Sequence, residues 1–369
     1  MEPEQTPADI LLRLSLVGGF TLRRLRELGA ALRKPFLPGF EEEGRGSAVR
    51  KGAAAIDSRD AGERAARVRE ACRRAGIEIV HAGSDAYPSL LREVPDAPLV
   101  LYVKGSPAPD ASLAVVGSRY PTAPGAEFAR VLARDLAMAG WAVVSGLARG
   151  IDAAAHEGAL RGGGRTFAVL GCGVDVVYPS EARRLRDRIV EQGGVLSEYP
   201  PGTLPLPHHF PARNRIISGL SRGVVVAEAA ARSGALITAR CALEQGREVM
   251  AVPGNPLLPH TRGSNGLLRD GAAPVTDPVD VLAALGRPAA PRARTGAESS
   301  GSAAGRHPPG TREREILRFL SAERHVDEIA ESLRIPVPEL LPLLLEMEFA
   351  KLLVRRPGDY YKKMSDIRG

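Results

Sequence analysis

The stretch WAVVSGLARGIDAAAHEGALRGGGRTFAVL, residues 141–170, decides the fold. Two apolar runs, WAVV (141–144) and TFAVL (166–170), flank a segment with helical spacing. A strand, a helix and a second strand in this order form a βαβ unit, in which the two strands run parallel. Similar runs occur at SLAVV (112–116), GVL (194–196), GVVVA (223–227) and EVMAV (248–252). The alternation predicts an α/β fold with a mostly parallel sheet and helices on both faces.

Glycines mark where several of these helices end. Gly140 and Gly246 follow helical segments directly, and a glycine closes a helix well because it tolerates the left-handed conformation. Gly162, Gly163 and Gly164 predict a turn between a helix and the strand at 166–170. The order of the strands across the sheet does not follow from these patterns.

The two ends of the chain have other patterns. Residues 286–310 are rich in Pro, Gly, Ser and Ala, which predicts a flexible linker. Residues 311–369 predict a winged helix, with a helix at EREILRFL, a helix-turn-helix around Ile335-Pro336 and a two-stranded wing around Pro357-Gly358. Residues 11–29 predict two short helices around Gly18-Gly19. That pair resembles a helix-hairpin-helix module, and it fits a plain hairpin packed on the main domain equally well.

Composition bounds the class of protein. The chain has 369 residues, 44% of them hydrophobic, and a net charge of +7, which excludes a wholly disordered protein. No apolar run is long enough for a membrane helix, and the acidic start MEPEQTPAD is unlike a signal peptide. Three widely spaced cysteines form no C-x-x-C pair, so we expect no disulfide framework and a reduced, cytoplasmic location.

The positive charge by itself is weak evidence for an acidic partner. The 50 basic residues comprise 44 Arg and 6 Lys, a skew that indicates compositional bias of the genome. Arginine positions, rather than arginine abundance, must therefore indicate a partner.

Polar loops follow the predicted strands directly. These loops begin Gly117-Ser118-Arg119, Ser145-Gly146, Gly171-Cys172-Gly173, Ser197-Glu198, Glu228 and Pro253-Gly254, and Arg232-Ser233-Gly234 opens the helix after Glu228. In an open parallel sheet the carboxyl ends of the strands share one edge, where ligands bind. We therefore expect these loops to line one groove.

Two of the loops suit an anion. Ser145-Gly146 and Ser233-Gly234 place small residues before helices, where backbone N–H groups and the helix dipole favour negative charge. Arg119 adds a full charge beside the first loop. The segment His208-His209-Phe210-Pro211-Ala212-Arg213-Asn214-Arg215 adds two arginines and a ring. Charge beside an exposed ring is what single-stranded nucleic acid needs, because phosphates pair with charge and bases stack on rings.

Several polar residues allow two interpretations. Asp152 either buttresses its helix or binds a ligand, and His156 lies on a helix face, which favours a structural role. Glu228 either acts as a general base or hydrogen-bonds the Ser233-Gly234 loop. His208 and His209 lack a carboxylate or cysteine at ligand spacing, so we expect no metal.

Established catalytic and cofactor motifs are missing from the sequence. There is no G-x-G-x-x-G and no G-K-[ST], and no residue set forms a nucleophile-base pair. We therefore expect no cofactor and no catalytic residues.

Taken in order, the loops resemble one known family. AVVGSRYPTAPG (114–125), VVSGLARGIDAAAHEGAL (143–160), HHFPARNRIISGLS (208–221) and VVVAEAAARSGALITA (224–239) together resemble the DprA/Smf family of DNA-processing proteins. YPSLLREVPDAPLVLYVKG (87–105) matches the same family. The resemblance covers about 81–285, and it extends to the winged-helix tail and the variable N-terminal helical region.

The resemblance implies four parts of the chain. They are an N-terminal helical (helix-hairpin-helix or SAM-like) domain at 1–80, an extended Rossmann-like DNA-binding domain at 81–285, a flexible linker at 286–310 and a winged helix at 311–369.

The resemblance also implies a function. Members of the family bind and protect incoming single-stranded DNA during natural transformation, load the recombinase RecA, form dimers and are not known as enzymes. By motif position the DNA-contacting candidates are Gly117, Ser118, Arg119, Ser145, Gly146, Phe210, Arg213, Asn214, Arg215, Ser233, Gly234 and Thr238. Some members carry a basic residue just before the Phe-Pro step, where this chain has Pro207, His208 and His209.

Two alternative functions compete with DNA protection. One is a nucleotide-ribosyl hydrolase of the related Rossmann-like group, which has a glycine-rich loop and a glutamate after a strand, as at Glu228. The other is a winged-helix regulator that binds duplex DNA through the tail. The tail holds 11 basic and 11 acidic residues, and Glu339, Glu346 and Glu348 lie on its predicted recognition helix, which disfavours that alternative.

Overall fold

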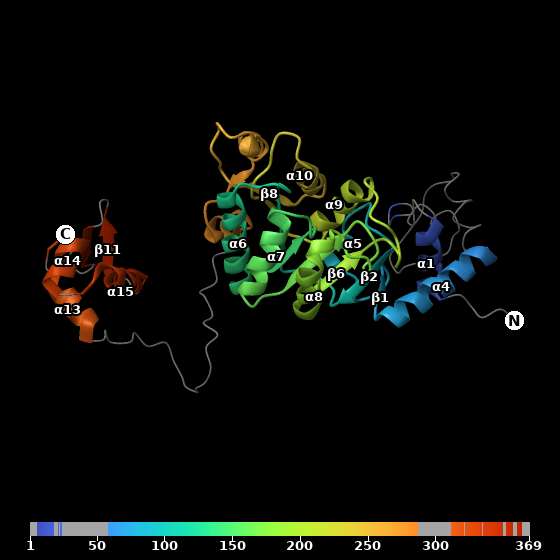
Figure 1. Cartoon of the computed structure of the whole chain (residues 1–369), viewed down its shortest axis with the longest axis horizontal. Helices are drawn as coiled ribbons and strands as arrows, with labels where there is room; N and C mark the ends of the chain where they lie inside the picture. The colour runs from blue at the N-terminus through green and yellow to red at the C-terminus, as the bar shows by residue number, and fades with distance from the viewer. Residues whose placement is uncertain are drawn as a thin grey trace. The chain divides into compact units, whose positions relative to one another are not determined.

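The structure is a computed structural model that describes residues 6–17, 21, 23, 58–286, 311–320, 322–333, 335–349, 352–356 and 360–363. Nine strands form one sheet in the order β1-β2-β6-β5-β4-β3-β7-β8-β9 (Figure 1). Their bounds are β1 Glu78–His81, β2 Val100–Gly105, β3 Ser112–Val116, β4 Ala142–Ser145, β5 Thr166–Leu170, β6 Gly194–Ser197, β7 Gly223–Val226, β8 Glu248–Ala251 and β9 Ala273–Pro274.

The sheet is doubly wound. The seven neighbouring strands from β6 across the sheet to β9, in the order β6-β5-β4-β3-β7-β8-β9, pair in parallel. Beyond β6 the sheet is extended by β2 and then β1, which pair antiparallel. From β3 the chain proceeds through β4, β5 and β6 to one side, and then returns to β7, β8 and β9 on the other. The prediction of a mostly parallel α/β fold is confirmed, and β3 and β7 form its topological switch point.

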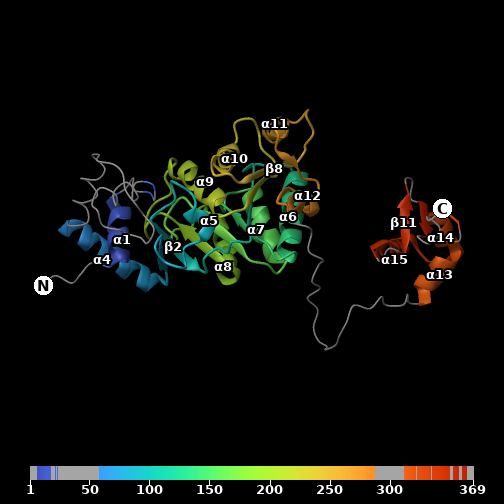
Figure 2. The same ribbon diagram turned by 180° about the vertical axis from the view of Figure 1, so that it is seen from behind.

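Helices cover both faces of this sheet (Figure 2). Their bounds are α5 Ser89–Arg92, α6 Ala123–Met138, α7 Ile151–Arg161, α8 Arg183–Gln192, α9 His209–Gly219, α10 Ala235–Glu244, α11 Arg262–Arg269 and α12 Pro278–Ala284, with 3-10 turns η1 Ser180–Ala182 and η2 Pro259–Thr261. In β3, Leu113 and Val115 pack with α6 and α7, whereas Ala114 and Val116 pack with α9 and α10. Successive strand residues point to opposite faces, so each helix pair covers its own face.

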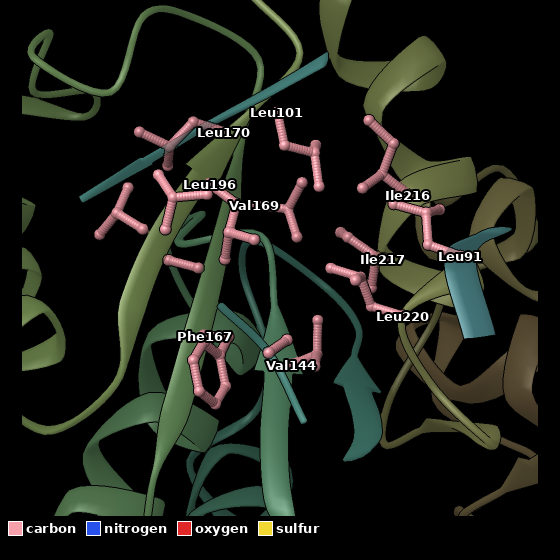
Figure 3. Packing of buried hydrophobic residues seen from close by; sticks show 14 of the residues in the cluster. Leu91, Leu101, Val144, Phe167, Val169, Leu170, Leu196, Ile216, Ile217 and Leu220 are labelled. Carbon is pink, nitrogen blue, oxygen red and sulfur yellow. The ribbon is translucent and has the colours of Figure 1, made fainter. Parts of the chain in front are cut away.

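The larger core lies between the sheet and α9. Ile216 and Ile217 of α9 and its capping residue Leu220 are at most 2% exposed and face Val144 and Val169 of the sheet (Figure 3). Full burial of one such aliphatic side chain contributes roughly 1.5–3 kcal/mol. This packing fixes where α9 lies, and α9 carries the residues from His209 to Arg215.

The described N-terminal helices belong to the same compact unit. α1 (Pro7–Val17) packs on α4 (Arg59–Ala75), and its Leu11, Leu12 and Leu14 share the core with Tyr102 of β2. The first compact unit runs from Met1 to Arg294. The predicted glycine turn at 18–20, most of the second hairpin helix and the linker at 287–310 lie outside the described residues, so the four-part division stays a prediction.

The tail is a winged helix, as predicted. Its elements are α13 Thr311–Phe319, β10 Arg324–His325, α14 Val326–Leu333, α15 Val337–Phe349, β11 Leu353–Arg356 and β12 Tyr360–Lys363. The strands pair in the order β10-β12-β11, and Ile316, Ile329, Leu344 and Tyr361 belong to the core of this unit. No helix within the described ranges of the chain is long and apolar enough to cross a membrane.

Glycines end helices where the sequence predicts. Gly140 follows the C-cap residue of α6 with φ of 87°, and Gly246 follows the C-cap residue of α10 with φ of 65°. Gly163 has φ of 68° in the turn between α7 and β5. Only glycine adopts these angles without strain, so the positions of these residues fix the helix lengths.

His156 of α7 is structural, in agreement with its position on a helix face. The ring is fully buried, and its Nδ1 lies 2.7 Å from Thr166 Oγ1, which itself donates to the Val143 carbonyl at 2.8 Å. The hydroxyl therefore accepts a hydrogen bond from Nδ1–H, and the buried Nε2 has no hydrogen-bond partner, which favours the neutral ring. Burial, with the positive charge of Arg213, lowers the pKa of His156 from 6.5 to about 3.

This buried ring makes stability depend on pH. Below pH 6.5 the histidine of the unfolded chain is protonated, whereas the ring in the folded protein is protonated only below a pH of about 3. Stability is therefore full above 6.5 and falls by about 1 kcal/mol per pH unit below it. His156→Gln keeps an N–H donor for Thr166 and does not titrate, so it should remove about that slope from urea unfolding measured between about pH 4 and pH 7. His208→Gln, at an exposed histidine, is the control, and equal slopes in wild type and His156→Gln would contradict the assignment.

Candidate nucleic-acid interface

A groove opens at the switch point between β3 and β7. The Ala227 amide donates to Val116 O at 3.0 Å, and the Ser118 amide donates to Glu228 O at 2.7 Å. Beyond these hydrogen bonds the segments that follow β3 and β7 separate. The groove has a volume of about 470 Å³. Its lining includes the predicted Gly117, Ser118, Arg119, Phe210, Arg213, Asn214, Ser233, Gly234 and Thr238. The topology thus gathers three segments at one edge, as expected, and the first and the last of them are more than a hundred residues apart in sequence.

Arg119 and Phe210 form the polar and aromatic wall of this groove. The Arg119 guanidinium carbon lies 5.7 Å from the centre of the Phe210 ring, within the range of a cation–π contact. Arg119 is exposed and, within the described residues, has no ion pair. Its charge is therefore available to an anion directly beside a ring.

Phe210 also borders a second pocket. This pocket has a volume of about 360 Å³ and shares Arg119, Tyr120, Phe210 and Arg213 with the groove. Tyr178 lines it, with its ring centre 5.5 Å from that of Phe210. The sequence analysis missed Tyr120 and Tyr178 as lining residues, although each lies next to a polar loop that it had identified.

Arg213 lies beneath the groove and not within reach of solvent. It is 4% exposed, and its Nη1 donates to Gly146 O at 2.9 Å and to Val169 O. Burial lowers its pKa, while Asp152 opposes that shift. The guanidinium thus ties the loop after β4, the end of β5 and helix α9 together.

Asp152 supplies the negative charge for this buried cation. Its Oδ2 accepts from the amides of Gly146 at 3.1 Å and Ala148 at 3.4 Å, so it buttresses the loop that precedes α7. Burial raises the pKa of Asp152, and the charge of Arg213 acts in the opposite direction. Of its two interpretations, the structure supports the buttress.

The loop from Ser145 to Gly150 is fixed by hydrogen bonds and by close backbone contacts. Ser145 is buried and donates to Val115 O at 2.7 Å. Leu147 adopts φ of 56°, which is strained for a residue with a β-carbon. At Gly150, φ is 78° and an added Cβ would lie 2.4 Å from Ser118 O. The loop is therefore pre-formed, and it presses its backbone against the segment that carries Arg119.

Arg215 and Asn214 are also engaged within the protein. Arg215 pairs with Glu198 at 2.7 Å and with Asp96 at 3.4 Å, and its side chain is 13% exposed. The side-chain Nδ2 of Asn214 donates to Gly234 O at 3.4 Å, which joins α9 to the start of α10. The expectation that three arginines offer charge side by side fits Arg119 alone. Direct DNA contact by Arg213 and Arg215 stays a prediction that their geometry does not favour.

The loop after β7 forms the opposite wall. Ser233 Oγ accepts from the Ala235 amide at 3.3 Å at the start of α10, and Arg232 and Gly234 are exposed. Thr238, one turn into α10, is 2% exposed and reaches the groove only at its floor.

Glu228 has a partner that neither interpretation proposed. Its carboxylate accepts from the Thr122 amide at 2.9 Å and from Thr122 Oγ1 at 2.5 Å. Thr122 is the N-cap of α6, so Glu228 fixes where that helix starts. The predicted hydrogen bond to the Ser233-Gly234 loop is replaced by this one, because sequence alone cannot show that a residue 106 positions away lies opposite, and the general-base interpretation is not tested.

The two histidines before Phe210 pack against aromatic neighbours. His209 is buried, with its ring 3.9 Å from that of Tyr199 and its Nδ1 3.1 Å from Gly171 O. Exposed His208 packs edge-on against it at 4.5 Å. In the part of the chain that the structure describes, no group of three His, Cys, Asp or Glu residues is placed to hold a metal ion.

Fold and site together define a Rossmann-like α/β protein with a charged, aromatic groove at its switch point. The family DNA recombination-mediator protein A matches residues 78–286, and the DprA winged helix domain matches 301–359. Because the first match spans more than half of the chain, this chain belongs to the DNA recombination-mediator protein A (DprA/Smf) family.

Individual relatives agree with this membership. Protein Smf of Escherichia coli (strain K12) is 42% identical over 293 residues, which cover 77% of each chain. DNA processing protein DprA of Streptococcus pneumoniae is 50% identical over 201 residues, covering 54% of this chain and 71% of that protein.

Two solved structures share the fold. The X-ray structure of DprA from Streptococcus pneumoniae covers 77% of this chain and 98% of its own, with 37% identity and a TM-score of 0.60. DNA processing protein A from Helicobacter pylori, described for its single-stranded DNA binding mode, covers 57% of this chain and 95% of its own, with 28% identity and a TM-score of 0.51.

The buried position of Arg213 predicts a large effect on stability. Arg213→Ala should lower the free energy of unfolding by about 3 kcal/mol, because two carbonyls lose their donor and Asp152 loses its counter-charge. Arg119→Ala, at an exposed site, should lower it by less than about 0.5 kcal/mol. Urea unfolding measures both. Equal stability of the two variants would show that Arg213 is not the internal tie described above.

Proposed function

We propose that this protein binds single-stranded DNA in the groove between β3 and β7, and that it protects incoming DNA and loads RecA during natural transformation. The observation that carries the proposal is Arg119, exposed and without an ion pair in the described residues, 5.7 Å from the Phe210 ring. A phosphate meets the guanidinium while the neighbouring base stacks on the ring or on the guanidinium plane.

The rest of the groove supports a strand over a small ligand. The walls offer backbone and small polar side chains at Gly117, Ser118, Ser233 and Gly234, which contact any sequence alike. Because charge, a ring and backbone groups make up much of this lining, we infer sequence-tolerant binding. The Helicobacter pylori relative is described for its single-stranded DNA binding mode, which supports single-stranded DNA as the ligand.

Family membership supports the remaining parts of the proposal. The relatives are named DNA processing proteins. We infer a cytoplasmic protein that is not an enzyme, that forms homodimers through its Rossmann-like domain and that delivers DNA to RecA. The engagement of Glu228 with Thr122 argues against the ribosyl-hydrolase alternative, because its carboxylate is 3% exposed and already accepts two hydrogen bonds.

Binding to oligo-dT at several salt concentrations tests the site. Arg119→Ala should weaken binding and reduce the salt slope by about 0.7, the contribution of one single-stranded phosphate. Phe210→Ala should cost about 1–3 kcal/mol of stacking at every salt concentration and leave the slope unchanged. Arg213→Ala should weaken binding only through the displaced loop, again with no change of slope.

Arg161→Ala is the matched control for charge. Arg161 is exposed at the end of α7, at the opposite edge of the sheet, and has no ion pair in the described residues. Its removal should leave the affinity within about twofold. If Arg119→Ala and Phe210→Ala also bind oligo-dT like wild type, the groove is not the DNA site.

A filament assay tests the RecA part of the proposal separately. On single-stranded DNA already covered by single-strand-binding protein, wild type should shorten the lag of RecA filament formation. Arg119→Ala should not, because a mediator must first hold the strand. An unchanged lag with wild type, despite normal DNA binding, would refute RecA loading and leave the DNA site intact.

A further inference from the structure

Exposed arginines on two helices of the first unit, α4 and α6, pair with acidic side chains of the same helix. On α4, Arg59 and Arg67 pair with Glu63 at 3.2 and 4.0 Å, and Arg74 pairs with Glu70 at 3.7 Å. On α6, Arg134 pairs with Asp135 at 2.8 Å. Single exposed arginines elsewhere, Arg161, Arg240 and Arg262, have no ion pair among the described residues.

Helix α8 departs from this pattern. Its inward face buries Arg186 and Ile189, and the acidic Asp187 pairs with Arg186 at 3.6 Å. Its outward face carries Arg183, Arg184 and Arg188, all exposed, and none has an ion pair in the described residues. Two of these charges lie in the first turn, where the helix dipole disfavours cations. These arginines therefore do not stabilise the helix through its dipole.

This basic face continues from the groove. The 3-10 turn η1, Ser180–Ala182, leads directly into Arg183. Ser180 and Glu181 line the second pocket, of which Phe210 and Arg119 are also walls. Arg149 pairs with Glu181 at this pocket, so the charge of Glu181 is already neutralised. A chain that leaves Phe210 across the second pocket therefore meets the outward face of α8 next.

We propose that Arg183, Arg184 and Arg188 form a phosphate track that extends the single-stranded DNA path from Phe210 along α8. The proposal rests on the proposed function and adds the direction in which the strand leaves the groove. The helical rise from Arg183 to Arg188 is about 8 Å, and the long arginine side chains extend this reach to the phosphates of neighbouring nucleotides. The three guanidiniums contact phosphates only, so the track adds affinity and length without sequence preference.

Two oligonucleotide lengths test the track. The variant Arg183→Gln/Arg184→Gln/Arg188→Gln keeps good helix formers on an exposed face, so the fold should persist. For a dT oligomer of about twenty nucleotides the salt slope should fall by about 2, and the affinity at about 0.1 M salt by about a hundredfold, since each contact contributes about 0.7 to the slope. For an oligomer of about six nucleotides, which fills only the groove, affinity should change by less than about threefold.

The control removes the same charge elsewhere. Arg59→Gln/Arg67→Gln/Arg74→Gln on α4 lowers the net charge by the same amount at exposed arginines that have acidic partners. This variant should bind both lengths like wild type. An equal loss in the α4 and α8 variants, an unchanged affinity for the long oligomer in the α8 variant, or an equal loss at both lengths would each overturn the track. Loss of binding by Arg119→Ala alongside any of these results would leave the groove itself standing.

Discussion

The buried guanidinium of Arg213 is the constraint on which the carboxyl edge of the sheet depends. It bonds the loop after β4 and the end of β5, and it anchors the first turns of α9, which carry Phe210. A single cation in so dry a place is expensive unless it is paired and hydrogen-bonded. Asp152 supplies the charge and at the same time holds the loop amides, so one internal pair positions the loop after β4 and the helix that carries Phe210. Arg119 can therefore remain on the surface without a structural task.

Local patterns predict the elements of this fold closely, because burial on both faces leaves continuous β-branched runs in parallel strands. The runs at 112–116 and 166–170 are β3 and β5 to the residue, and the other predicted strands differ by a residue or so at their ends. Strand order and the antiparallel β1–β2 edge depend on pairing between distant segments, which no local window contains. The groove was predictable for a topological reason, since every parallel strand ends at the same edge.

The roles of single side chains were less accessible. Arg119, Arg213 and Arg215 look alike in sequence, yet one is exposed, one is buried and one is ion-paired. A signal did exist for Arg213. It lies three residues before Ile216, four before Ile217 and seven before Leu220, and residues at this helical spacing share one face. Arg213 is therefore on the helix face that is buried. For Arg215 and Glu228 no such signal exists, since their partners Glu198 and Thr122 come from other parts of the chain.

The bond between Glu228 and Thr122 orders events during synthesis of the chain. Helix α6 receives its capping partner from a residue that leaves the ribosome 106 positions later. Strand β7 must also join β3 before the Ser118 amide finds its acceptor. Contacts this distant in sequence form late, because loop closure must precede them. A nascent chain thus has β3, β4 and β5 well before it has a groove, and nucleic acid near the ribosome meets no completed site on it.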